Sequence, residues 1–412
     1  MVFNCDVKIV DMMMGSGKSS AAINYINDSD DDERFLYITP LIDEVDRVIQ
    51  ACSGKNFVQP EQRYKTDTKT NNIKRLLNSR KNIVSTHALF KLFDQETIDL
   101  CRAGNYTLIM DEVADVVNEY FVTKNDYDNL LEKYVNIEED TRILRWREDQ
   151  GNYTGRFYPE KKLCEMECLA DYGNTAMLYL FPISTFNAFR KIYILTYMFD
   201  AQIQRLYYDF YKVPYSHLYV DGETPTEYHF TDVPQKKLCK YDMRKLIHIC
   251  DHTKLNQIGD RETDLCMSWY KRNKDNYAMA KLKNNLLNFF CNISHAKTKD
   301  TLWTTYKEFK SELKGKGYSS GYLYHTARAL NGYGDRHYVA YPINKYMQPC
   351  IKKFFESNGV SVDEDKYALS EMLQFIWRSA IRNGESINVY IPSIRMRTMF
   401  EKWINLISAE QP

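Results

Sequence analysis

The sequence lacks an excess of charge of either sign: 55 basic residues are matched by 55 acidic residues, so the formal net charge is zero. This balance excludes a uniformly basic, coat-like nucleic-acid binder, although it leaves room for a local groove that grips a polyanion. The sequence also lacks any apolar run long enough to cross a bilayer and any charged-then-apolar leader. We therefore expect a cytoplasmic protein that neither spans a membrane nor is exported.

Paired metal-ligand spacing is also missing. The ten cysteines are scattered, and none shows the C-x₂-C spacing that makes a zinc site convincing. The nearest candidates are Cys164 with Cys168, and a loose group of Cys239, His248, Cys250 and His252. We expect free thiols in a reducing compartment. No internal repeat or low-complexity tract is visible, and 412 residues suggest two domains.

One glycine-containing segment, residues 12–20, organises the first part of the chain. A β-branched stretch at 7–11 predicts a buried strand before it, and residues 21–26 predict a helix after it. Strand, glycine turn, Lys-Ser and helix form the context of a phosphate-binding loop, in which glycines permit positive φ and the helix N-terminus attracts anions. A chance glycine turn is the alternative, since Met12 replaces the usual first glycine. The residues predicted to bind a nucleoside triphosphate are Met14, Gly15, Ser16, Gly17, Lys18, Ser19 and Ser20.

Short apolar segments alternate with helical patterns after this loop. Predicted strands cover 34–40, 82–87, 106–112, 176–181 and 191–196, and predicted helices cover 41–50, 73–77 and 202–211. This alternation predicts a parallel α/β sheet flanked by helices, with ligands at the carboxyl ends of the strands. Residues 113–173 interrupt the pattern, and we interpret them as an insertion.

The strand at 106–112 ends on two carboxylates, Asp111 and Glu112. Triphosphate hydrolysis needs Mg²⁺ at the β- and γ-oxygens and an aligned water molecule. We predict that Asp111 holds Mg²⁺ together with Ser19, and that Glu112 orients the water. A helix N-cap followed by a first-turn acid is the structural alternative.

The second half predicts a smaller sheet. Its expected strands are 301–305, 338–341 and 387–391; a helical segment covers 253–297, and helices cover 370–382 and 396–407. On a continuous helix, Gln374, Arg378 and Arg382 would share one face because they are spaced by four. Such arginines can neutralise charge on a transferring phosphoryl group. An ordinary solvated face is the alternative.

In chain order these segments resemble the motifs of superfamily 2 helicases. The phosphate loop, Thr39-Pro40, Ser85-Thr86-His87, Asp111-Glu112, Leu195-Thr196 and Gln374…Arg378…Arg382 correspond to motifs I, Ia, Ib, II, III and VI. The chain resembles the DEAD/DEAH-type helicase-like proteins carried by bacteriophages, which would place it in a bacterial host cytoplasm. Residues 327–335 stand where motif V would lie.

The resemblance implies two RecA-like domains, 1–200 and 201–412, with ATP in the cleft between them and a helical insertion at about 253–297 in the second. It implies ATP and Mg²⁺ as cofactors, Lys18, Asp111 and Glu112 as catalytic residues, and Thr196 as the link between hydrolysis and movement. Gln374, Arg378 and Arg382 would sense the γ-phosphate, and Asp335 would contact the nucleotide. The expected nucleic-acid contacts are Thr39, Pro40, Thr86, His87, Thr304 and Arg328.

Our first hypothesis is therefore an ATPase that translocates on DNA and unwinds it. We expect sequence-nonspecific, salt-sensitive binding of single-stranded or forked DNA, with RNA as a second polymer and replication or recombination proteins as partners. A packaging-type motor is a second enzymatic hypothesis, although its nuclease half is matched only by the acidic patch at 363–365, which a helix cap explains. The third is a nucleotide-gated switch that recruits partners and unwinds nothing.

Overall fold

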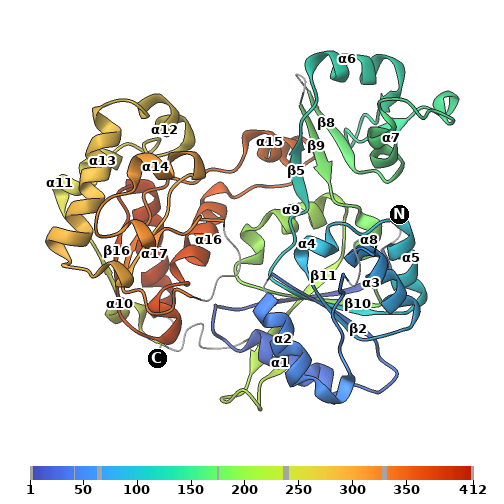
Figure 1. Cartoon of the computed structure of the whole chain (residues 1–412), viewed down its shortest axis with the longest axis horizontal. Coiled ribbons are helices and arrows are strands. Elements are labelled where there is room, and N and C mark those ends of the chain that lie inside the picture. The colour runs from blue at the N-terminus through green and yellow to red at the C-terminus, as the bar shows by residue number, and fades with distance from the viewer. Residues whose placement is uncertain are drawn as a thin grey trace. The chain divides into compact units, whose positions relative to one another are not determined.

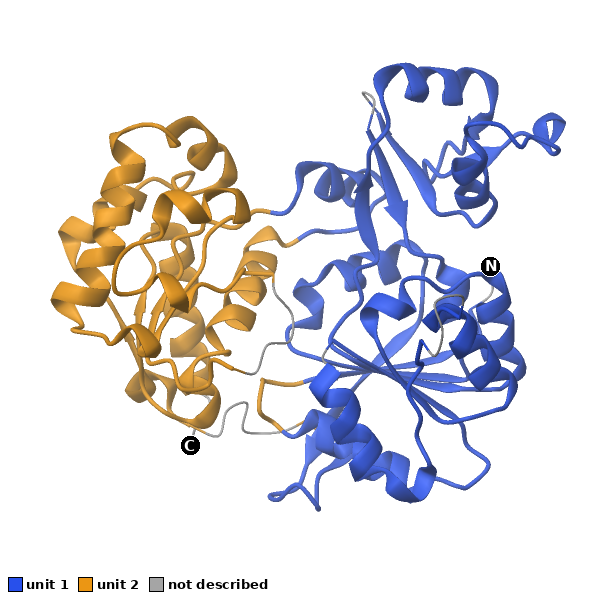
Figure 2. Cartoon of the chain, viewed as in Figure 1, with its two compact units in different colours: residues 1–11, 17–233, 347–362 blue, residues 12–16, 234–346, 363–412 orange. Residues whose placement is uncertain are grey.

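The computed structural model describes residues 3–40, 42–62, 67–173, 176–234, 241–326 and 332–409. The chain divides into two compact units (Figure 2). Unit 1 comprises Met1–Asp11, Gly17–Val233 and Met347–Val362, and unit 2 comprises Met12–Ser16, Pro234–Tyr346 and Asp363–Pro412. The domain boundary predicted at residue 200 differs from this division, because a strand well beyond it still pairs with the first strand of unit 1.

Unit 1 contains a seven-stranded sheet of order β12-β11-β1-β10-β4-β2-β3. All neighbouring pairs are parallel except the antiparallel edge pair β11–β12. The strands are, in sheet order, β12 (His229–Thr231), β11 (Tyr215–Asp221), β1 (Asp6–Asp11), β10 (Lys191–Thr196), β4 (Thr107–Asp111), β2 (Phe35–Thr39) and β3 (Ile83–Thr86). The predicted parallel α/β sheet is confirmed.

Helices connect these strands, as parallel crossovers require. Their bounds are α1 (Lys18–Asp28), α2 (Ile42–Ala51), α3 (Lys69–Asn78), α4 (His87–Phe90), α5 (Gln95–Ala103), α8 (Ile183–Phe186) and α9 (Ile203–Phe210), with α15 (Pro349–Ser357) returning from later in the chain. The central strands are apolar almost throughout: all five residues of β2 are buried. Such continuous apolar runs are typical of strands covered on both faces.

Residues 113–173, which we interpret as an insertion, fold together with the strand that follows them around a small core of their own. This region contains a three-stranded antiparallel sheet of order β5-β9-β8 and a two-stranded β6–β7 hairpin. The elements are β5 (Val117–Tyr120), α6 (Lys124–Lys133), β6 (Val135–Ile137), β7 (Leu144–Trp146), α7 (Tyr158–Glu165), β8 (Leu169–Gly173) and β9 (Ala176–Leu180). Figure 1 shows β5, β8 and β9 near α6 and α7. The interpretation of 176–181 as a strand of the main sheet is wrong, because β9 pairs with β5 and β8 instead.

Unit 2 contains a four-stranded parallel sheet of order β13-β16-β15-β14. The strands are β13 (Ile247–Ile249), β14 (Thr301–Trp303), β15 (Tyr338–Ala340) and β16 (Ile387–Tyr390). The helices are α10 (Met243–Leu246), α11 (Thr253–Asn256), α12 (Met267–Asn273), α13 (Tyr277–Leu287), α14 (Lys310–Leu313), α16 (Glu364–Ile376) and α17 (Ile394–Ala409). Three of these strands and the helical segment at 253–297 match the sequence predictions, whereas β13 was not predicted.

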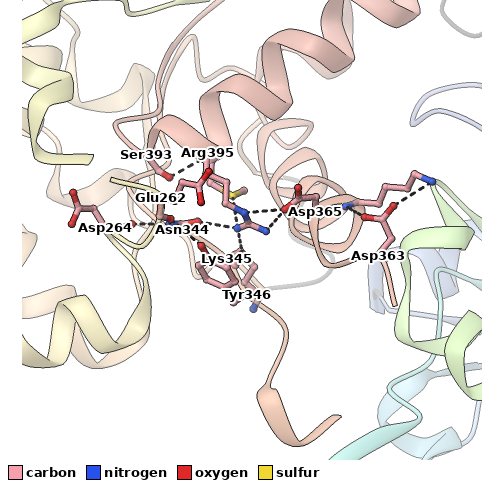
Figure 3. A network of polar contacts seen from close by, with 11 residues as sticks. Glu262, Asp264, Asn344, Lys345, Tyr346, Asp363, Asp365, Ser393 and Arg395 are labelled. Carbon is pink, nitrogen blue, oxygen red and sulfur yellow. Dashed lines mark hydrogen bonds and ion pairs between the residues drawn. The ribbon is translucent and has the colours of Figure 1, made fainter. Parts of the chain in front are cut away.

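A polar network holds the start of α17 within unit 2 (Figure 3). Arg395 donates to Asp365 Oδ1 from Nε at 3.0 Å and from Nη2 at 2.6 Å, and to Asn344 Oδ1 from Nη1 at 2.9 Å. Asn344 in turn donates through Nδ2 to the carbonyl oxygens of Glu262 and Asp264. One guanidinium therefore joins three segments of unit 2 that are distant in sequence.

The predicted helix cap at the acidic patch is confirmed. Asp363 is the N-cap of α16, and its side chain accepts a hydrogen bond from the Lys366 amide at 2.9 Å. The nine cysteines within the described residues are free thiols, and burial raises the pKa of several, for example that of Cys52 to about 11. Within the described residues, none of the helices combines the length and apolarity needed to cross a bilayer.

Candidate nucleotide site

The glycine-containing segment lies between β1 and α1, as predicted. Gly15 and Gly17 adopt φ values of 82° and 86°, in the left-handed region that favours glycine. Gly17 is the N-cap of α1, and its carbonyl oxygen accepts the first helical hydrogen bond from the Ala21 amide at 2.9 Å. Lys18 and Ser19 thus occupy the first turn of an 11-residue helix, where the N–H groups have no intrahelical acceptor.

Ser16 adds an unsatisfied donor to this loop. Its hydroxyl oxygen is buried and has no hydrogen-bond partner among the residues that the structure describes. A buried polar atom without a partner costs free energy unless a ligand or water satisfies it. A phosphate oxygen is a suitable partner, because it accepts hydrogen bonds and is favoured near a helix N-terminus.

The strand β4 brings a carboxylate to the first turn of α1. Ser19 Oγ lies 3.4 Å from Asp111 Oδ2, although the two residues are separated by 92 positions in sequence. A hydroxyl and a carboxylate are hard oxygen donors of the kind Mg²⁺ takes, and Mg²⁺ usually completes its shell with water and substrate phosphate oxygens. The residues present therefore fit Mg²⁺. No group of three or more His, Cys, Asp or Glu side chains that could hold a metal was found in the described parts of the chain.

Glu112 follows in a strained backbone conformation. Its φ is 67°, which is uncommon for a non-glycine residue, and its amide donates to the Leu195 carbonyl oxygen at 2.9 Å. His87 Nε2 lies 2.8 Å from the carbonyl oxygen of Asp111. Strain held in place by neighbouring elements is concentrated at functional sites. The chain therefore turns sharply at the carboxylate pair, and His87 of α4 and Leu195 of β10 contact the backbone of the turn.

The charges of the site perturb one another. Burial raises the pKa of the Asp111 carboxyl to about 7, with repulsion from Glu112 and Glu44 adding to the effect and Lys18 opposing it. Burial lowers the pKa of Lys18, whereas the nearby Glu112, Asp111 and Asp11 carboxylates raise it. A lysine and three carboxylates therefore share one partly buried region, as expected of a site that binds a charged ligand.

Two polar residues of this region, Asp11 and Gln202, were not predicted as site residues from the sequence. Asp11 ends β1, and its carboxylate accepts hydrogen bonds from the Met198 amide at 2.7 Å and the Phe199 amide at 2.9 Å. Gln202 Nε2 donates to Thr196 Oγ1 at 2.9 Å, and Thr196 is fully buried. The end of the phosphate-loop strand is thus joined to the segment after β10. A polar residue at the end of a predicted strand was the available signal for Asp11, as it was for Asp111.

The residues expected to touch nucleic acid are placed unevenly. Thr39 and Pro40 follow β2, while Thr86 and His87 lie at the junction of β3 and α4. Pro40, Thr86 and His87 are partly exposed, but Thr39 is fully buried. Thr304, after β14, is also fully buried, so neither threonine hydroxyl faces solvent in this structure. Arg328 lies outside the described residues.

The predicted continuous helix at 370–382 is wrong. The helix α16 ends at Ile376, Ser379 is extended with φ −81° and ψ −173°, and a 3₁₀ turn covers Ala380–Asn383. Gln374, Arg378 and Arg382 therefore do not share one helical face. Ser379 Oγ donates to the Ile376 carbonyl oxygen at 2.6 Å and so completes the helix end. Gln374 and Arg378 are partly buried, and Arg382 is exposed.

Asp335 lies in unit 2, on a turn before β15. It is exposed and forms an ion pair with Arg336 Nε at 3.1 Å. Because it belongs to unit 2 while α1 and β4 belong to unit 1, its predicted role toward the nucleotide stays a prediction.

Fold and site together define an α/β protein with two parallel-sheet units, in which a glycine-containing loop links the first strand to the first helix. The chain belongs to the YonV family: it is 37% identical over 408 residues to YonV, an SPbeta prophage-derived protein of Bacillus subtilis (strain 168), covering 97% of this chain and 98% of that protein. Residues 241–404 match the family model described as the YonV C-terminal Rossmann-like domain. This match agrees with the parallel sheet of unit 2.

The fold is also similar to a solved structure, that of S. tokodaii Xpd4. The TM-score is 0.50 at 11% sequence identity, and the match covers 97% of this chain and 94% of the other. At this identity the similarity shows the fold alone. It supports the α/β architecture over nearly the whole chain.

Proposed function

We propose that this protein is a nucleic-acid-stimulated ATPase that translocates on DNA and unwinds it. The observation that carries the proposal is the approach of Ser19 Oγ to Asp111 Oδ2, 3.4 Å apart, at the N-terminus of the helix that follows the glycine-containing loop. A chance glycine turn gives no reason for a carboxylate from another strand to meet this serine. A site for a metal-bound triphosphate explains this approach, because both oxygen atoms would bind the metal ion.

The loop provides the groups that a triphosphate needs. The first-turn amides of α1 and the Ser16 hydroxyl donate hydrogen bonds, and Lys18 neutralises charge on the β- and γ-phosphates. Ser19 and Asp111 would hold Mg²⁺, which when bound neutralises charge that develops on the phosphate oxygens.

Glu112 is the proposed residue for the attacking water. Its backbone is fixed by the hydrogen bond to Leu195, so the side chain leaves the strand in a direction set by the αL turn. A carboxylate held beside the γ-phosphate can accept a hydrogen bond from the water and align it for in-line attack.

Hydrolysis could be linked to movement through the segment after β10. Asp11 and Gln202 fix this segment to the end of β1 and to Thr196, as described above. We therefore expect a change in charge at the phosphate loop, which follows β1, to act on residues 198–199, which are hydrogen-bonded to Asp11 at the end of β1. By resemblance to superfamily 2, Gln374, Arg378 and Arg382 would respond to the γ-phosphate, and this role is part of the proposal.

DNA is the proposed track, with Pro40, Thr86 and His87 as partly exposed contacts. The SPbeta prophage origin of YonV agrees with the proposal that this protein serves a bacteriophage. ATP hydrolysis by the full chain should be measured with single-stranded DNA, duplex DNA, forked DNA and RNA at two salt concentrations. We expect stimulation by single-stranded or forked DNA that weakens with salt. Hydrolysis unaffected by every polymer would refute the motor and favour a nucleotide-gated switch.

A further inference from the structure

The edge hairpin of the main sheet packs against the glycine-containing loop. The strands β11 and β12 are joined by residues 222–228, and the Tyr228 ring covers Gly17: a Cβ atom at Gly17 would lie 2.6 Å from Tyr228 Cδ2 and Cε2. The tyrosine is partly exposed, whereas the loop residues before it are exposed. An aromatic ring therefore flanks the start of α1.

This tyrosine is held in place from two sides. Asn24, on α1, donates through Nδ2 to the carbonyl oxygens of Tyr228 at 2.8 Å and Pro225 at 3.0 Å. Phe230, two residues further along, packs against Tyr25 and stacks on Tyr193, with ring centroids 5.8 Å and 5.2 Å apart. These contacts anchor the segment that carries Tyr228 against α1 and the neighbouring sheet.

The sheet order shows which end of a nucleotide would meet this ring. Asp111 lies on β4, on one side of β1, whereas β11 and β12 lie on the other side. The Asp111–Ser19 approach marks the Mg²⁺ and γ-phosphate end of the proposed site. A triphosphate that extends along the loop from that end brings its nucleoside toward the side that carries Tyr228.

We propose that Tyr228 is the stacking platform for the base of the nucleotide, an assignment that rests on the proposed function. The substrate class is a purine nucleoside triphosphate, because stacking on a ring face rewards large π-systems and discriminates weakly among bases. ATP and GTP should therefore bind with similar affinity, and both more tightly than UTP.

The test compares ligands with and without a base. Dissociation constants of Mg-ATP and of Mg-tripolyphosphate are measured by titration calorimetry for the full-length wild type, Tyr228→Ala and Tyr228→Phe. His229→Ala is the matched control, because His229 is the next residue and its side chain is exposed. Tyr228→Ala should weaken ATP binding by roughly 10-fold and leave tripolyphosphate binding unchanged. Tyr228→Phe and His229→Ala should resemble the wild type.

Several results would overturn the assignment. An unchanged ATP affinity in Tyr228→Ala, or an equal loss for ATP and tripolyphosphate, would show that the ring does not hold a base. Tighter ATP binding in Tyr228→Ala would show that the ring obstructs the loop. If the wild type bound tripolyphosphate as tightly as ATP, the base platform would be refuted and the phosphate site retained. Binding of neither ligand would refute the proposed function itself.

Discussion

Replacing Asp111 by asparagine should stabilise the nucleotide-free protein at pH 8 while removing Mg²⁺ binding. Burial raises the pKa of this carboxyl to about 7 in the folded protein. In an unfolded chain the pKa of an aspartate is about 3.9. Between these values the folded state binds a proton that the unfolded state has released. The free energy of unfolding therefore falls as pH rises from about 4 to about 7, and stays low above that range.

The magnitude follows from the shift. About three pKa units correspond to about 4 kcal/mol, because each unit is worth about 1.4 kcal/mol. Asp111 is partly exposed, so solvent screens its charge and we expect about 2 kcal/mol. Asparagine has nearly the same shape and no charge. The stability difference between Asp111→Asn and wild type should thus be larger at pH 8 than at pH 5.

Thermal unfolding of both proteins in EDTA at pH 5 and pH 8 measures this difference. We expect Asp111→Asn to melt about 4 °C above the wild type at pH 8, and by clearly less at pH 5. In a parallel series without EDTA, Mg-ATP should raise the melting temperature of the wild type only. Asp99→Asn, which changes an exposed carboxylate of α5, is the control. A difference that is the same at both pH values, or that is larger at pH 5, would refute the argument.

Four further substitutions test three separate features of the protein. Glu112→Gln should retain ATP binding and lower hydrolysis by about 100-fold in steady-state assays, whereas parallel loss of both would contradict its role with water. Gly17→Ala should lower the melting temperature and abolish nucleotide binding, because φ is 86° and the Tyr228 ring occupies the position of the new Cβ atom. Gly15→Ala should lower the melting temperature less, because φ is 82° but no atom lies within 4 Å of the new Cβ atom. Arg395→Ala should destabilise unit 2 by about 2 kcal/mol, since Asp365 and Asn344 lose their donor, and unchanged thermal unfolding would contradict this.

The sequence predicted those parts of the fold in which local pattern and tertiary structure agree. The loop at 12–20 was predictable because strand, glycines and helix are contiguous. Asp111 and Thr196 were predictable as polar residues that end apolar runs. Such signals do not depend on knowledge of the pairing partners.

Pairing and helix ends were harder to predict. The apolar run of β9 does not distinguish a parallel partner from an antiparallel one, so its place in the insertion sheet could not be foreseen. The helix at 370–382 was predicted too long because residues 377–382 contain neither glycine nor proline. Its end depends on Ser379, whose side chain competes for a helical carbonyl group.

Tyr228 gave no sequence signal at all. It is one of 32 tyrosines and follows a polar, proline-containing stretch. Tyr228 lies against Gly17 because β12 runs back antiparallel to β11. This arrangement brings together residues 17 and 228, which are 211 positions apart in the chain. Residues of this kind become visible only when the sheet is assembled.

The most direct test of the central claim is the rate of ATP hydrolysis by wild type and Lys18→Ala, with single-stranded DNA present. If the loop holds the phosphates beside Ser19 and Asp111, the wild type hydrolyses ATP and Lys18→Ala, although folded, falls to background. Hydrolysis by Lys18→Ala at the wild-type rate would contradict the claim.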